Sequence, residues 1–256
     1  MDVKAYLERI NYKGSLIPSY ESLCKLQLSH LLTVPFENLS IHKNEPIILD
    51  YELLYAKIVT DRRGGFCYEL NGLFAQLLRQ LGHNVTILSA EVAESQGGFG
   101  LAFDHMTLKI SLDDNWLVDV GFGDSFREPL LIEKRDVQFQ GKRAYRITES
   151  NHHLILSEKQ DGSDWKTQYR FTQKSYELED FIEMCNYHQT SPKSHFTQKR
   201  VCSIAKSNGR LTISDMRLIE TIGNERREKI ISDELEYNII LEKEFGIIIK
   251  PMIKNN

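Results

Sequence analysis

The chain has 256 residues, 41% of them hydrophobic, which is enough for a substantial core in one large domain or in two to three small ones. Its 32 basic and 36 acidic side chains nearly balance, with a net charge of −4, and the charged runs are short and mixed. This composition argues against a nucleic-acid-binding protein. No apolar run approaches ~18 residues and no signal peptide is evident, so we expect a soluble cytoplasmic protein without a membrane partner.

The first segment, residues 1–83, is predicted to be helical. Asp2 and Ser19 can each cap a helix, and the second helix must end before Pro35. Asp50 is placed to begin a third helix. Between the second and third helices, a loop around residues 35–39 is expected.

A fourth helix is predicted directly after the paired glycines of residues 63–71, RGGFCYELN. Cys67 should lie in its first turn, and Gly82 should end it. Unpaired N–H groups and the helix dipole at this position favour a thiolate. A lone cysteine, however, is more often a small core residue, so a base and an orienting acid are needed to support a catalytic role.

Such partners are predicted on a β-hairpin that includes His105 and Asp119. Its alternating pattern places both side chains on one face of adjacent strands, either directly opposite or offset by two residues. Either residue alone would usually be solvated, whereas the pair can serve a nucleophile.

Short alternating segments continue from residue 84 to about residue 171 and predict an antiparallel meander or barrel. A helical bridge over residues 177–189 follows. The overall expectation is an α+β fold with a helical domain at 1–83, a β-barrel domain at 84–190 that ends in the bridge, and a small α/β lid at 191–256.

Four motifs in this order resemble those of the arylamine N-acetyltransferases, in particular the bacterial members. They are residues 35–39 (PFENL), 63–71 (RGGFCYELN), 105–108 (HMTL) and 117–123 (LVDVGFG). The resemblance implies a catalytic core like that of cysteine proteases and transglutaminases, with Cys67, His105 and Asp119 as the catalytic triad. It also implies a resting thiolate–imidazolium pair.

The activity implied by the resemblance is a ping-pong acetyl transfer. Acetyl-CoA would acylate Cys67, and an arylamine, arylhydrazine or arylhydroxylamine would then attack the acetyl-cysteine while His105 relays the proton. Acetyl-CoA is therefore the expected co-substrate, and no metal is expected.

The substrate contacts are also inferred from the resemblance. Apolar walls for the acceptor are assigned to Phe36, Phe66 and Phe122, each of which could equally be a core residue. Contacts to CoA are assigned to Gly121, Phe122, Gly123, His195 and Phe196. We expect Arg63, Glu69 and Asn71 of the same motif to be structural.

Other functions remain open at this point. The same triad could hydrolyse esters, transfer acyl groups as transglutaminases do, or close amides on polyketide chains. From a different class of protein, Cys67, His105 and Asp119 could bind zinc in a regulatory protein. The four cysteines are far apart and form no C-x-x-C pair, which argues against a zinc ribbon or a disulfide framework.

Overall fold

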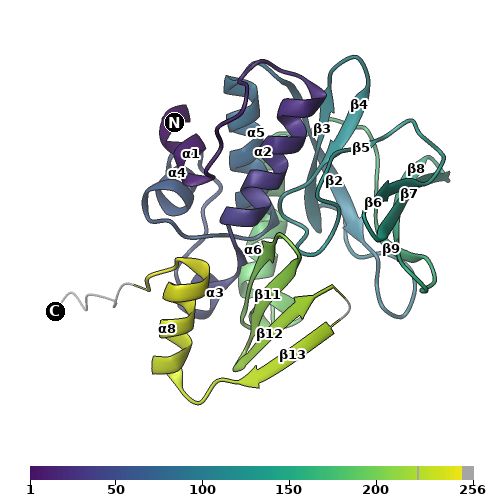
Figure 1. Cartoon of the computed structure of the whole chain (residues 1–256). Helices are drawn as coiled ribbons and strands as arrows, with labels where there is room; N and C mark the ends of the chain where they lie inside the picture. The colour runs from purple at the N-terminus through teal and green to yellow at the C-terminus, as the bar shows by residue number, and fades with distance from the viewer. Residues whose placement is uncertain (224, 250–256) are drawn as a thin grey trace.

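The N-terminal helices surround one buried helix, α5, in the computed structural model, which describes residues 1–223 and 225–249 (Figure 1). They are α1 (Val3–Arg9), α2 (Tyr20–Thr33), α3 (Leu39–His42), α4 (Tyr51–Tyr55), η1 (Ala56–Thr60) and α5 (Cys67–Gln80). The predicted caps Asp2, Ser19 and Asp50 each accept a backbone N–H in the first turn of their helix. Gly82, at φ +88°, follows the end of α5, as predicted.

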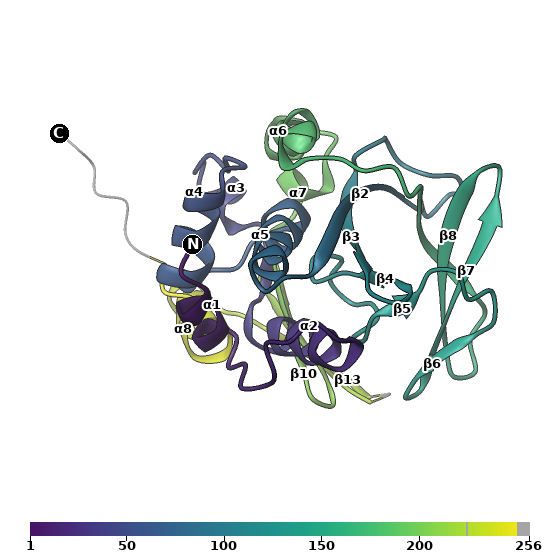
Figure 2. The same cartoon turned by 90° about the horizontal axis from the view of Figure 1, so that it is seen from above.

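An eight-stranded antiparallel sheet forms the nearly closed barrel that the alternating pattern predicts (Figure 2). Its strand order is β5-β4-β3-β2-β9-β8-β7-β6. The strands are β2 (Asn84–Val92), β3 (His105–Ser111), β4 (Asn115–Val118), β5 (Leu130–Leu131), β6 (Gln138–Gln140), β7 (Arg143–Ser150), β8 (His153–Gln160) and β9 (Lys166–Phe171).

The two faces of strand β3 belong to different cores. Met106, Leu108 and Ile110 pack with the apolar stripe of α5, whereas a second cluster, which includes Leu117 and Tyr169, fills the barrel interior. Period-two alternation produces this division, because successive side chains leave a strand on opposite faces. The helix that begins at Cys67 is therefore fixed against the strand that begins at His105.

The C-terminal part contains a five-stranded sheet covered by helix α8 (Glu234–Phe245). The sheet order is β1-β10-β11-β12-β13, with β1 (Phe36–Glu37), β10 (Val201–Lys206), β11 (Gly209–Ser214), β12 (Arg217–Ile222) and β13 (Glu225–Ile230). The bridge comprises η2 (Leu178–Phe181) and α6 (Ile182–Thr190), followed by α7 (His195–Gln198).

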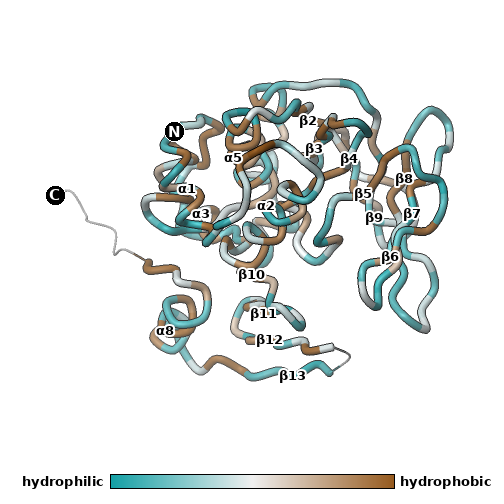
Figure 3. Tube along the Cα trace, turned by 45° about the horizontal axis from the view of Figure 1, so that its top comes forward, coloured by the Kyte–Doolittle hydropathy of each residue, from teal (hydrophilic) through white to brown (hydrophobic). Residues whose placement is uncertain are grey.

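Two strands of this sheet are not among the elements predicted from the sequence. The segment expected to be a loop supplies strand β1, in which Phe36 and Glu37 pair with Ser203 and Cys202 of β10. The charged run at residues 225–229 is solvent-exposed and forms the edge strand β13, which is hydrophilic for most of its length (Figure 3). Partners distant in the sequence determine both pairings. The domain boundaries remain a prediction.

Among the described residues, no helix is long and apolar enough to cross a membrane.

Candidate active site

His105 and Asp119 form a buried hydrogen-bonded pair at the ends of strands β3 and β4. Nε2 of His105 lies 2.7 Å from Oδ2 of Asp119, and each residue is 3% exposed. The predicted shared face is therefore confirmed. Leu108 pairs with Val118, and continuing this register by one residue places Asp119 opposite Thr107, two residues away from His105. The face is buried rather than solvated, because it points toward the barrel interior.

Each of the two carboxylate oxygens of Asp119 accepts two hydrogen bonds. Oδ1 accepts from Nδ2 of Asn71 and from the amide of Gly121, each at 2.9 Å. Oδ2 accepts from His105 and, at 3.2 Å, from the hydroxyl of Tyr169. Burial by itself raises the pKa of Asp119, but the contacts with His105, Asn71 and Gly121 outweigh it and hold the pKa below its usual value. Asp119 is therefore a stable carboxylate partner for an imidazole.

Asn71 joins the helix of Cys67 to the strands of His105 and Asp119. Besides its bond to Asp119, its Nδ2 donates to the carbonyl of Met106 at 2.7 Å, and its Oδ1 accepts from the amide of Val120 at 2.9 Å. All of its polar hydrogens are thereby used within a buried environment. The predicted structural role of Asn71 is correct, and it holds the candidate active site together.

Cys67 is the first residue of α5 and is 3% exposed. A Cβ added to Gly121 would lie 2.8 Å from Cα of Cys67, so only glycine permits this approach of the loop after β4. The backbone amide of Met106 faces the sulfur. The structure thus places Cys67 beside the ends of β3 and β4, where the His105–Asp119 pair lies.

The burial of Cys67 acts against its ionisation. Burial raises the pKa of the Cys67 thiol, and the charges of Asp104 and Asp119 act in the same direction, whereas the Met106 amide opposes them. Burial thus opposes the thiolate that the helix terminus favours. The thiolate–imidazolium pair stays a prediction.

The residues assigned to substrates lie in two groups. The ring of Phe122 packs 5.0 Å from the ring of His105. The ring of Phe196 lies 5.6 Å from that of Phe66 and 6.2 Å from that of Phe36, and Phe66 is completely buried. His195 begins the short helix α7 and is exposed.

Sequence reasoning did not single out Tyr169, Asp104 or His188 as parts of this region. Tyr169 contacts Asp119 only because β9 pairs with β2 across the barrel, and the sequence contains no local signal for this contact. Asp104 could have been noticed because it directly precedes His105. His188 follows Cys185 by three residues, which places it on the same face of the predicted helix.

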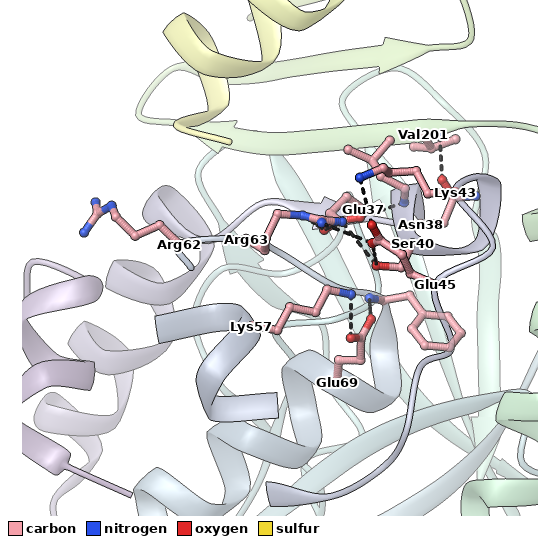
Figure 4. Close-up of polar contacts among 12 residues, drawn as sticks. Glu37, Asn38, Ser40, Lys43, Glu45, Lys57, Arg62, Arg63, Glu69 and Val201 are labelled. Carbon is pink, nitrogen blue, oxygen red and sulfur yellow. Dashed lines mark hydrogen bonds and ion pairs between the residues drawn. The ribbon is translucent and has the colours of Figure 1, made fainter. Parts of the chain in front are cut away.

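On the other side of the α5 N-terminus, a buried ion network confirms the structural prediction for Arg63 and Glu69 (Figure 4). Nε of Arg63 donates to Glu37 at 2.9 Å, and Nζ of Lys57 lies 2.7 Å from Oε1 of Glu69. Glu69 also accepts the backbone amide of Phe66 at 3.1 Å, which caps the helix just before Cys67.

Within the described ranges, no group of three or more His, Cys, Asp or Glu side chains is placed to hold a metal ion. The three-ligand zinc site considered from the sequence is therefore not formed by Cys67, His105 and Asp119.

A family model described as N-acetyltransferase matches residues 19–253. The arylamine N-acetyltransferase pineal gland isozyme NAT-10 of Gallus gallus is 32% identical, over 95% of this chain and 96% of that relative. Proansamycin X synthase of Amycolatopsis mediterranei is 30% identical, over 94% and 96% of the two chains. The structure of Mycobacterium marinum arylamine N-acetyltransferase in complex with CoA matches with a TM-score of 0.89 at 29% identity, over 96% of this chain and 93% of that one.

Proposed function

Because this chain belongs to the arylamine N-acetyltransferase family, we propose that it transfers the acetyl group of acetyl-CoA through Cys67 to the nitrogen of aromatic amines, hydrazines and hydroxylamines. The observation that carries the proposal is the buried His105–Asp119 pair, which Asn71 joins to the helix of Cys67. The CoA bound by the Mycobacterium marinum relative supports acetyl-CoA as the donor.

The first half-reaction requires the Cys67 thiolate, which burial opposes and which a base must therefore support. Asp119 holds Nε2 of His105, so Nδ1 is the ring nitrogen that can take the thiol proton. As the sulfur of Cys67 forms its bond to the acetyl carbon, the proton passes to His105 and the thioester bond to CoA breaks. The leaving CoA thiolate then takes this proton from the imidazolium, which leaves neutral His105 and acetyl-Cys67.

The second half-reaction runs through the same groups. The acceptor nitrogen attacks the acetyl-cysteine and gives one proton to His105. The bond between carbon and Cys67 breaks, and the sulfur recovers the proton as a thiol. Negative charge on Asp119 stabilises the imidazolium in both halves, and its four hydrogen bonds fix the orientation of the ring.

An amine must compete with water for the acetyl group. Cys67 is almost completely buried, and the ring of Phe122 covers one side of His105. We assign Phe122, Phe36 and Phe196 to the aryl acceptor, while Phe66 supports Phe196 from the core. The loop of Gly121 and Gly123 and the exposed His195 are assigned to CoA.

A second candidate acceptor is an amine within the acylated molecule itself. The similarity to Proansamycin X synthase favours this possibility. The same triad would then close an amide intramolecularly instead of acetylating a separate arylamine.

Two-stage acetyl transfer tests the proposal. The protein is incubated with acetyl-CoA, freed of small molecules, and divided between buffer, an aniline and an arylhydrazine. We expect N-acetylated product in the amine portions and slow loss of acetyl in buffer. Equally fast loss in buffer would indicate a hydrolase. No transfer to either acceptor, with amide closure of a long acyl-amine thioester, would indicate the second candidate.

A further inference from the structure

A second histidine–aspartate pair lies next to the first one and is not used by the proposed mechanism. Nε2 of His188 in α6 lies 3.1 Å from Oδ1 of Asp104, an ion-pair contact rather than a well-directed hydrogen bond. Nδ1 of His188 lies 3.0 Å from Oγ of Ser194. His188 is 6% exposed. A buried histidine held on both nitrogens has a fixed position beside the carboxylate.

This pair is connected to both reacting residues through the backbone and Tyr68. Asp104 directly precedes His105, and Tyr68 directly follows Cys67. The Tyr68 hydroxyl donates to the carbonyl of Phe103 at 2.7 Å and to that of Asp104 at 3.2 Å. The ring of His188 stacks on the ring of Tyr68, with 6.1 Å between centroids. Tyr68 therefore ties the backbone of Asp104, directly before His105, to the residue directly after Cys67.

The charge of Asp104 opposes ionisation of the nucleophile. Three ionisable groups act on the Cys67 sulfur in this direction, namely Asp104, Asp119 and Cys185. Asp119 is paired with His105. Asp104 lies 3.1 Å from Nε2 of His188, so this imidazole is placed to weaken the field of the carboxylate at Cys67.

The groups that face His188 contain no other close acid among the described residues. They are Asp104, the hydroxyl of Ser194, and the rings of Tyr68, Tyr187 and Phe196. Asp104 is therefore the acidic partner of His188 in this part of the structure.

We propose that His188 is a positioning residue that holds Asp104 and offsets its charge, so that the proton of Cys67 can pass to His105. This inference rests on the proposed function, because it concerns the nucleophile of that reaction. The inference predicts that removing His188 and removing the charge of Asp104 have opposite effects on the ionisation of Cys67. Without His188 the uncompensated carboxylate disfavours the thiolate, and without the charge of Asp104 the thiolate is favoured.

The test is the rate of Cys67 alkylation by iodoacetamide from pH 5 to 10, followed by peptide mass spectrometry. This readout needs no acetyl-CoA. We expect the rate at pH 7 to fall about three- to tenfold in His188→Asn and to rise by a similar factor in Asp104→Asn. The double variant should resemble Asp104→Asn, because His188 acts only through that carboxylate. His83→Asn is the matched control, since His83 is also buried but lies beyond the opposite end of α5.

If the alkylation rate of Cys67 changed in the same direction in both single variants, the proposal would be overturned. An unreactive Cys67 in the unaltered protein would also overturn it, as would an unchanged pH profile in His188→Asn with only a lower melting temperature. If the alkylation rate changes in opposite directions in the two variants but the unaltered protein takes no acetyl group from acetyl-CoA, the inference stands and the proposed function fails. Acetyl transfer without these opposite changes would support the proposed function and overturn the role of His188.

Discussion

Two buried polar networks lie on opposite sides of the first turn of α5, and they are built differently. The ion network around Arg63, Glu37, Lys57 and Glu69 satisfies its charges internally and joins β1, η1 and the helix cap. The network around Asp119 satisfies the carboxylate completely, yet it leaves a thiol and one imidazole nitrogen for an incoming group. One network maintains the fold, while the other combines a rigid support with two groups that can exchange a proton.

This difference separates the expected effects of substitutions. A change in the Asp119 network should reduce activity more than stability, whereas a change in the Arg63 network should do the reverse. The largest effect of all is expected at Asp119 itself.

Asp119→Asn should reduce kcat/KM for acetyl transfer by on the order of 10³–10⁴. The amide keeps an acceptor for Asn71 and Gly121 but removes the charge that stabilises the His105 imidazolium. Steady-state kinetics measure the effect on activity, and thermal unfolding measures the effect on stability. Tyr169→Phe, which removes only one of the four bonds to Asp119, is the control. A loss of less than tenfold in Asp119→Asn would place this residue among the merely structural ones.

Arg63→Ala should destabilise the protein by about 3–5 kcal/mol, because it leaves the completely buried carboxylate of Glu37 without its partner. Urea unfolding gives the free energy. Combining Arg63→Ala with Glu37→Gln should restore part of the lost free energy of unfolding, since the unpaired charge is then absent. A cost below about 1 kcal/mol, typical of a surface ion pair, would contradict the structural role assigned to this network.

Asn71→Ala should affect both properties, because Asn71 is the link between α5 and the two strand ends. Its removal leaves buried backbone groups of Met106 and Val120 without a partner, which costs about 1–3 kcal/mol. Activity should fall as well, because Cys67 and His105 are no longer held together. Asn186→Ala, at an exposed position of α6, is the control. Unchanged activity in a destabilised variant would show that the link is not needed for the reaction.

The smallest effect is in the pH dependence of stability, where Asp119 of one network and Glu69 of the other should differ in sign. The pKa of Asp119 is lowered, so its contribution is present above the usual aspartate pKa and is lost as the pH falls through the folded value. Burial raises the pKa of Glu69 despite Lys57. Its contribution is therefore present below the usual glutamate pKa and is lost as the pH rises through the folded value.

Unfolding free energies from pH 3 to 8 test this contrast. The free energy of unfolding of the unaltered protein, minus that of Glu69→Gln, should fall as the pH rises. The same difference taken against Asp119→Asn should rise over the low end of the range. If both free-energy differences changed with pH in the same direction, the carboxylates of Glu69 and Asp119 would have similar environments.

Much of this arrangement could be predicted from local sequence patterns. Cap residues and apolar spacing indicate the helices, and alternation places His105 and Asp119 on one face. Features that depend on distant pairing could not be predicted, such as β1 in the C-terminal sheet, Tyr169 beside Asp119, and the contact between His188 and Asp104. The burial that raises the pKa of the Cys67 thiol could not be predicted for a related reason, because the helix terminus is local, whereas burial comes from the whole fold.

Intact-mass measurement after brief exposure to acetyl-CoA tests the central claim most directly, comparing the unaltered protein with Cys67→Ala. The account predicts a mass increase of one acetyl group in the former, removed by an arylamine, and no increase in the latter. An unaltered protein that gains no acetyl group, or equal acetylation of Cys67→Ala, would contradict it.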